Sequence, residues 1–177
     1  MLRYLSDRLE EQVRGAGLSY GVKLSLHPTK GYIGLQILRA SHLVEAFKII
    51  QNILRNHIRN FKIWDESLVA SARGSIIYTL VANEETKENL IEVDLKAYLR
   101  GNDVNYNRKL IHSVAQVKLK DLKKVANMIL PQFLSPNLTQ TVVVCHPTTM
   151  RKVEEEFMKA GISLTVFDSL EDSYLAK

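Results

Sequence analysis

Cysteine is nearly absent from this chain, which limits the chemistry it can perform. The 177 residues include one cysteine, Cys145, so no disulfide can form within the chain. No histidine and acidic residue are patterned around Cys145 as in a nucleophilic site, and the apolar run 142–145 predicts that it is buried in a strand. Hydrophobic runs of membrane-spanning length are absent as well. Arg3, Asp7 and Arg8 are charged where a signal peptide is apolar.

These absences predict a soluble chain with no membrane span and no targeting signal. They fit an intracellular compartment, cytoplasmic or mitochondrial. Histidines are also sparse, because no two of the five lie closer than fifteen residues. Helical metal sites usually place two histidines within one turn, so we expect no metal or other cofactor in this chain. Each histidine is expected at the surface or in a hydrogen bond. The five are His27, His42, His57, His112 and His146.

Positive charge is in slight excess, with a formal net charge of +5. A basic nucleic-acid-binding domain is one interpretation, but acidic runs at 84–85 and 154–156 interrupt the excess. The densest basic stretch, 118–124, has the apolar periodicity of a helix and no aromatic residues that could stack on bases. A solvated helix face accounts for this stretch better, and we expect no nucleic-acid partner.

The apolar pattern predicts an α+β fold, with an antiparallel sheet and a helical layer in one domain over residues 1–177. Strands are expected at both ends of the chain and about seven helices elsewhere. Ser41 is expected to cap the second helix. The predicted strands are 18–26, 32–38, 141–145 and 162–167. The predicted helices are 2–15, 41–60, 65–82, 85–99, 106–116, 119–133 and 147–161.

The segment 14–21 is the most informative stretch, because it joins the first helix to the first strand. It reads Arg-Gly-Ala-Gly-Leu-Ser-Tyr-Gly, and Gly15 and Gly17 can supply the positive φ that ends a helix. The guanidinium of Arg14 is always charged and presents several N–H donors in a fixed plane, and Tyr20 presents one hydroxyl on a rigid ring. Such a pair suits gripping carbonyl oxygens. Each residue also has a structural alternative: Arg14 as a cation complementing the helix dipole, and Tyr20 as a core residue.

This segment resembles the pitrilysin-type zinc metallopeptidases, the inverzincins, in their presequence-protease-like branch. That branch has a segment similar to Arg-Gly-x-Gly-x-x-Tyr-Gly, which Arg14 and Tyr20 match. The stretches 72–78, 98–108 and 117–122 are also similar to it, so the resemblance covers about residues 1–135. It implies that Arg14 and Tyr20 bind substrate in a catalytic chamber.

The family binds zinc through a His-x-x-Glu-His helix, and this chain contains no such motif. The resemblance therefore implies a C-terminal, non-zinc half that grips peptide substrates. Its partner would be an N-terminal zinc-bearing half in cis or in trans, and the zinc would belong to the complete enzyme. By itself the chain is expected to be inactive. Its domain is expected to be incomplete, since the opening strands of the family's sheet would precede Met1. The alternative is a non-catalytic assembly or scaffold subunit of pitrilysin-like fold.

Overall fold

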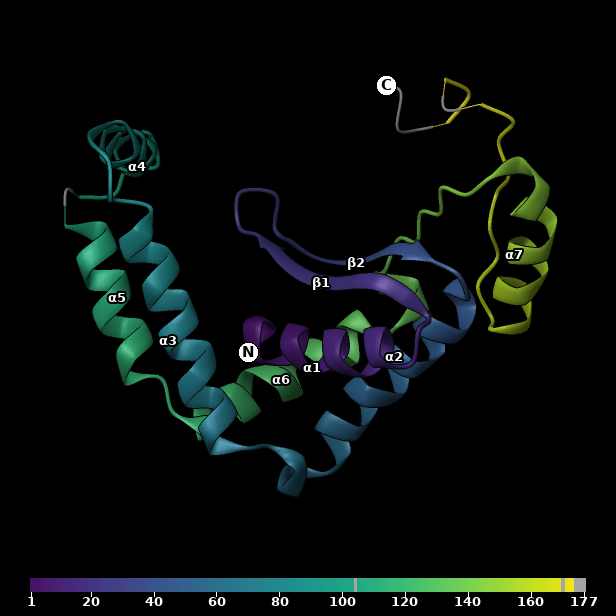
Figure 1. Ribbon diagram of the computed structural model, residues 1–177, viewed down its shortest axis with the longest axis horizontal. Coiled ribbons are helices and arrows are strands. Elements are labelled where there is room, and N and C mark those ends of the chain that lie inside the picture. Colours follow the sequence, from purple (N-terminus) through teal and green to yellow (C-terminus); the bar gives the residue numbers. More distant parts are fainter. Residues whose placement is uncertain (104, 170, 174–177) are drawn as a thin grey trace.

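The computed structural model describes residues 1–103, 105–169 and 171–173, and it shows an α+β fold (Figure 1). Over these residues the chain forms seven α-helices and one two-stranded antiparallel sheet, which confirms the predicted fold class. The strands are β1 (Ser19–His27) and β2 (Tyr32–Ala40). The helices are α1 (Leu2–Gly15), α2 (Leu43–Arg59), α3 (Glu66–Ala82), α4 (Lys87–Leu99), α5 (Tyr106–Gln116), α6 (Leu119–Phe133) and α7 (Pro147–Lys159). None of the described helices has both the length and the apolar character needed to cross a membrane.

Helix α1 ends in a glycine-dependent turn that leads directly into β1. The Gly17 amide donates to the Arg14 carbonyl at 2.9 Å, and the Leu18 amide donates to the Val13 carbonyl at 3.2 Å. This is the Schellman arrangement, and it requires the left-handed backbone that Gly17 adopts at φ 70°. Gly15, also predicted to have positive φ, is instead the last helical residue of α1. The helix end is therefore fixed by a single glycine.

The hairpin β1–β2 lies over α1, and its register is regular from Gly21 opposite Leu38 to His27 opposite Tyr32. Its turn uses Gly31 at φ 71°, as the glycine in the predicted loop suggests. The outer edge of β1 is tied to α1, because the Leu24 amide donates to the Ser6 hydroxyl at 2.8 Å. This bond satisfies an amide that no strand partner reaches.

A hydrophobic core forms where α1 packs between the hairpin and the helices α2 and α6 (Figure 1). Leu5, Leu9 and Val13 of α1 are fully buried at helical spacing. Tyr4 stacks on Trp64 at a centroid distance of 4.9 Å, and its hydroxyl accepts a hydrogen bond from the Asp65 amide. These contacts hold the start of α3 against α1.

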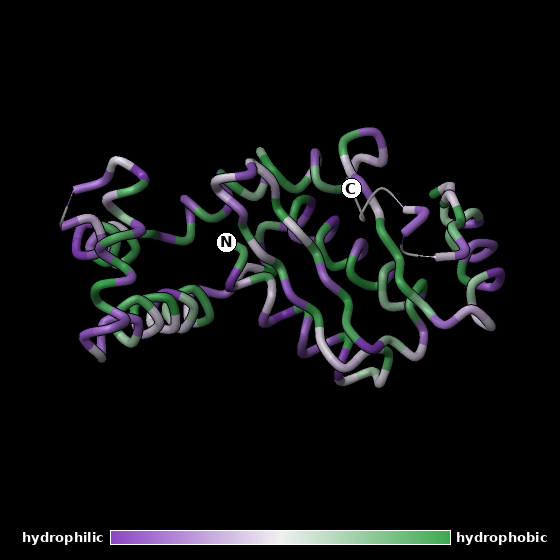
Figure 2. The backbone as a smooth tube through the Cα atoms, turned by 90° about the horizontal axis from the view of Figure 1, so that it is seen from above, coloured by the Kyte–Doolittle hydropathy of each residue, from purple (hydrophilic) through white to green (hydrophobic). Residues whose placement is uncertain are grey.

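Helices α3 and α5 pack against each other in an arm that extends from this core, and α4 lies at its far end (Figure 1). Arg73 on α3 donates to the Val117 carbonyl at 3.0 Å, and Asn107 on α5 donates to the Leu80 carbonyl at 3.3 Å. No residue of α4 or α5 is buried within the described part of the chain. Figure 2 shows hydrophobic residues in these helices, far from the hairpin. The arm thus has little core of its own.

Two predicted strands are absent from the described residues. Residues 141–145 run extended between α6 and α7 and form no strand, and residues 162–167 form no strand either (Figure 1). A β-branched run becomes a strand only when a neighbouring backbone completes its hydrogen bonds, and β1 and β2 are the only paired strands in the part of the chain that the structure describes. The prediction that Cys145 is buried is wrong too, because the thiol is exposed. His146, expected at the surface or in a hydrogen bond, caps α7 by accepting from the Thr148 amide.

Ser41 also has a different role from the predicted one. Its hydroxyl donates to the carbonyl oxygens of Gly17, at 3.0 Å, and Leu18, at 3.2 Å, and it caps no helix. The residue that precedes α2 is His42, which makes no side-chain cap. Ser41 therefore ties the end of the hairpin to the turn after α1. This contact joins the residue after β2 to the segment 14–21, the helix–strand seam.

Candidate substrate-binding site at the helix–strand seam

Arg14 lies in the last turn of α1, where the Schellman turn fixes its backbone. Its side chain is 60% exposed, and one guanidinium nitrogen lies 3.5 Å from the Glu10 carboxylate one turn earlier. An exposed pair at this spacing contributes only about 0.3–0.5 kcal/mol in a helix. Arg14 is therefore positioned by the helix end and remains available to a ligand.

Tyr20 is the second residue of β1 and projects beyond the region that α1 covers. Val22 and Leu24, on the same side of the strand, are buried against α1, whereas Tyr20 is 62% exposed. Its hydroxyl forms no hydrogen bond with any described residue. The alternative that Tyr20 is a core residue is therefore wrong, and its donor is free for a ligand.

The structure brings Arg14 and Tyr20 together and adds a second arginine. The Arg14 guanidinium carbon lies 5.5 Å from the centre of the Tyr20 ring, and that of Arg39 lies 5.4 Å from it. Both distances are within the range of cation–π contacts. Arg39 comes from the end of β2, opposite Tyr20, because the neighbouring pairs are Ser19 with Ala40 and Gly21 with Leu38.

The sequence did not identify Arg39. The hairpin loop was predicted at 27–31, and counting outward from its middle places residue 38 opposite residue 20, whereas the observed register pairs His27 with Tyr32 and so sets Arg39 opposite Tyr20. The predicted second strand also stopped at Leu38, two residues before β2 ends at Ala40. Contact between strand ends depends on register, and the one extra residue in the predicted loop shifts the register by one.

The backbone of Arg39 is unusual. Its φ of 49° is the only positive value at a non-glycine residue within the described ranges. The left-handed region is unfavourable for most side chains, and occupying it costs on the order of 1–3 kcal/mol. Such a backbone persists only where its surroundings enforce it. The adjoining seam contacts of Ser41 supply part of that constraint.

The functional groups exposed at the seam are mainly hydrogen-bond donors. Two guanidinium groups and one phenol face solvent together, and Glu10 is the nearby acid. Arginine cannot act as a base at physiological pH, so the arrangement suits binding an oxygen acceptor. Across the described residues, no three histidine, cysteine or acidic side chains are grouped to hold a metal ion. The site can grip a carbonyl or a carboxylate.

A separate pocket of about 410 Å³ lies away from the seam, between α1, α2 and the turn after α2. Arg8, Gln12, Asn56 and His57 are among its lining residues. His57 is buried, and its Nδ1 donates to the Ile53 carbonyl at 2.8 Å. Burial lowers the pKa of His57, and the nearby Arg8 charge lowers it further, although the bond to Ile53 opposes this. The ring is therefore neutral at pH 7, with Nε2 as an unpartnered acceptor.

The chain is similar to part of two much longer proteins. Uncharacterized protein YOL098C of Saccharomyces cerevisiae is 26% identical over 166 residues, which cover 90% of this chain and 15% of the yeast protein. Uncharacterized protein C05D11.1 of Caenorhabditis elegans is 19% identical over 158 residues, covering 88% of this chain and 16% of the nematode protein. Neither name states an activity. No protein-family model matches the chain, and no solved structure matches it.

Proposed function

We propose that this chain is the substrate-gripping, non-zinc portion of a pitrilysin-like zinc metalloendopeptidase that cleaves peptides in an enclosed chamber. The observation that carries the proposal is the exposed pair of Arg14 and Tyr20 at the seam, with the Tyr20 hydroxyl unbonded within the described residues. The resemblance of the segment 14–21 to the presequence-protease-like branch supplies the reaction class. Both relatives are several times longer than the chain, which is compatible with a zinc-bearing half elsewhere.

In this proposal the chain binds and orients the peptide backbone. Tyr20 donates its hydroxyl proton to a backbone oxygen near the scissile bond, and Arg14 donates a second hydrogen bond from its guanidinium. A zinc ion held by the other half of the complete enzyme would supply an activated water. Because both donors address backbone oxygens, neither discriminates among neutral side chains. Donors of this kind lower the barrier by favouring the negative charge that develops on the carbonyl oxygen.

The test is cleavage of a quenched fluorescent peptide by the complete enzyme, meaning this chain with its zinc-bearing half. Tyr20→Phe keeps the ring and removes the donor, so kcat/KM is expected to fall by about 100-fold, as for the loss of one oxyanion donor. The free energy of unfolding should change by less than about 1 kcal/mol, because no intramolecular hydrogen bond is lost.

Tyr98→Phe is the matched control, since Tyr98 is 77% exposed on α4 and remote from the seam. It is expected to leave cleavage unchanged. Arg14→Lys keeps the charge, loses the fork and should also slow turnover. The chain alone, supplied with zinc, should bind the metal weakly and cleave nothing. Unchanged cleavage in both seam variants would show that the seam does not bind substrate.

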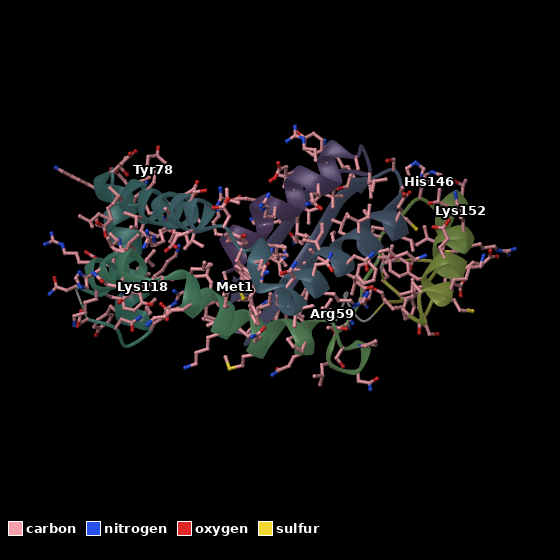
Figure 3. All side chains as sticks on the ribbon, turned by 90° about the horizontal axis from the view of Figure 1, so that it is seen from below. Met1, Arg59, Tyr78, Lys118, His146 and Lys152 are labelled. Atoms are coloured by element: carbon pink, nitrogen blue, oxygen red, sulfur yellow. The ribbon has the colours of Figure 1, made fainter. Side chains whose placement is uncertain are left out.

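An assembly or scaffold subunit of pitrilysin-like fold is the second candidate. It is favoured by the exposed apolar side chains of the arm, which include Tyr78, Ile91 and Tyr98 (Figure 3 labels Tyr78). A scaffold would associate with partner proteins through such a surface and would tolerate Tyr20→Phe in every assay. Zinc-dependent cleavage that depends on Tyr20 separates the two functions.

A further inference from the structure

We infer that Arg39 is a third binding residue of the seam and that it makes the seam selective for peptides bearing a carboxylate. The inference rests on the proposed function only in taking a peptide as the ligand. Arg39 lies opposite Tyr20 at the end of β2, and its guanidinium reaches the same ring as that of Arg14. The ligand chemistry is one carboxylate group, from an acidic side chain or from the peptide's C-terminus.

Two like charges on one exposed ring are unfavourable to each other. Both guanidinium carbons lie within 5.5 Å of the Tyr20 ring centre, so each contributes a positive potential where the other sits. Contact with the negative face of the ring relieves this repulsion in part. An anion beside the phenol is attracted by both groups at once, and this attraction distinguishes it from a neutral carbonyl.

The protein itself supplies one acid to this pair. Glu10 lies 3.5 Å from Arg14, and it is on the same helix. Among the described residues, no carboxylate lies within ion-pairing distance of Arg39. The positive charge at the end of β2 is therefore not neutralised internally. A guanidinium presents paired donors that match the two oxygens of a carboxylate.

The backbone of Arg39 adds an independent reason. Its φ of 49° lies in the left-handed region, where glycine or asparagine is more usual than arginine. A glycine at this position would relieve the backbone but would remove the cation from the ring. Strained residues of this kind concentrate at binding sites. The side chain and the strain together point to Arg39 as part of the site.

The experiment is an NMR titration of the 177-residue chain with matched peptides, following the Tyr20 ring and the arginine Nε–H signals. One pair differs only by Glu or Gln in the middle of the peptide, and a second pair differs only by a free or an amidated C-terminus. The acidic member of at least one pair should bind about two- to fivefold more tightly, the range expected for exposed ion pairs. The pair that shows the preference identifies the source of the carboxylate.

Arg39→Gln is expected to abolish that preference, and Arg39→Lys to retain part of it, because the charge remains and the fork is lost. Arg59→Gln removes an equal charge at the far end of α2 and should leave the preference unchanged (Figure 3 labels Arg59). Glu10→Gln frees Arg14 from its acid and should strengthen the preference. Glu10→Gln also keeps the inference testable if Arg39→Gln does not fold, which circular dichroism would reveal.

The outcomes separate this inference from the proposed function. If no acidic peptide is preferred, or if Arg39→Gln and Arg59→Gln behave alike, the carboxylate site is wrong, whatever the effect of Tyr20→Phe on cleavage. If the preference depends on Arg39 but the complete protein cleaves no peptide, the binding site stands and the peptidase assignment falls. Where an acidic peptide is preferred, added salt should weaken that preference, because the ion pairs are exposed.

Discussion

At the scale of single residues, position decides which side chains are available for function. Tyr20 and Tyr4 have the same chemistry, but Tyr4 is buried, and its hydroxyl bonds to the Asp65 amide. Tyr20 is 62% exposed, and its hydroxyl forms no hydrogen bond with any described residue. The difference comes from what covers each ring, since α1 buries Tyr4 in the core but ends before it can cover Tyr20.

The buried His57 predicts a pH dependence of stability. Burial lowers its pKa in the folded state below the ordinary value of about 6.5, which the unfolded chain retains. As the pH falls below about 6.5, the unfolded state binds the proton first, so the free energy of unfolding decreases. The decrease is complete below the folded-state pKa. Urea unfolding at several pH values between 7 and 5 measures this decrease. The change in unfolding free energy per pH unit should be smaller in His57→Gln, and an equal change in both proteins would contradict the assignment.

At the scale of elements, the packing of one helix against one strand edge builds the seam. Helix α1 buries Leu9 and Val13 beneath the hairpin, while Ser6 accepts the amide of Leu24 from the edge of β1. Ser41 then ties the other end of the hairpin to the turn after α1. These contacts fix the distance between the end of α1 and the end of β2, and hence between Arg14 and Arg39.

Ser6→Ala tests the contact between α1 and the edge of β1. The substitution leaves the Leu24 amide without its acceptor, which costs about 1–3 kcal/mol. Alanine's better helix propensity offsets a few tenths of a kcal/mol of this cost. The expected net loss is about 1 kcal/mol or more of unfolding free energy, measured by urea denaturation. Ser113→Ala is the control, because the Ser113 hydroxyl bonds only within its own helix. Equal effects of the two substitutions would mean that the Ser6 bond does not support the strand.

At the scale of the whole molecule, the chain exposes more apolar surface than its core accounts for. The arm of α3, α4 and α5 extends away from the hairpin, and helix α4 buries no described residue (Figures 1 and 2). Large exposed apolar residues on this arm lie on α3 and α4 at helical spacing. They include Tyr78, Val81, Leu90, Ile91, Leu95, Tyr98 and Leu99. Surfaces of this kind usually meet another protein segment.

The arm predicts that the isolated chain binds a hydrophobic dye and self-associates. Replacing Ile91 and Leu95 together by glutamine removes two neighbours on one helix face, 66% and 54% exposed, and should lower both signals. Leu138→Gln is the control, since Leu138 is 69% exposed but isolated from the arm. Dye fluorescence and sedimentation velocity provide the measurements. A monodisperse monomer with no dye binding would contradict the prediction that the arm is an interaction surface.

Much of the helical structure could be predicted from the sequence, because it depends on local patterns. The bounds 106–116 and 119–133 were predicted without error, and the hairpin loop was placed to within one residue. Helix periodicity and a turn glycine are local signals. The predicted strands 141–145 and 162–167 failed for the opposite reason. A strand needs a neighbouring backbone, and β-branched composition alone cannot supply one.

The sequence by itself determined the seam: a helix that ends at a glycine, followed by a strand that begins beside an arginine and a tyrosine. Only the tertiary structure decided that Tyr20 is exposed, that Arg39 joins it, and that Cys145 lies at the surface. Local conformation follows from steric and hydrogen-bonding preferences within a few residues, and the sequence shows those residues directly. Exposure and contact depend on where α1 ends relative to the hairpin and on strand register, and these are fixed only when distant segments pack together.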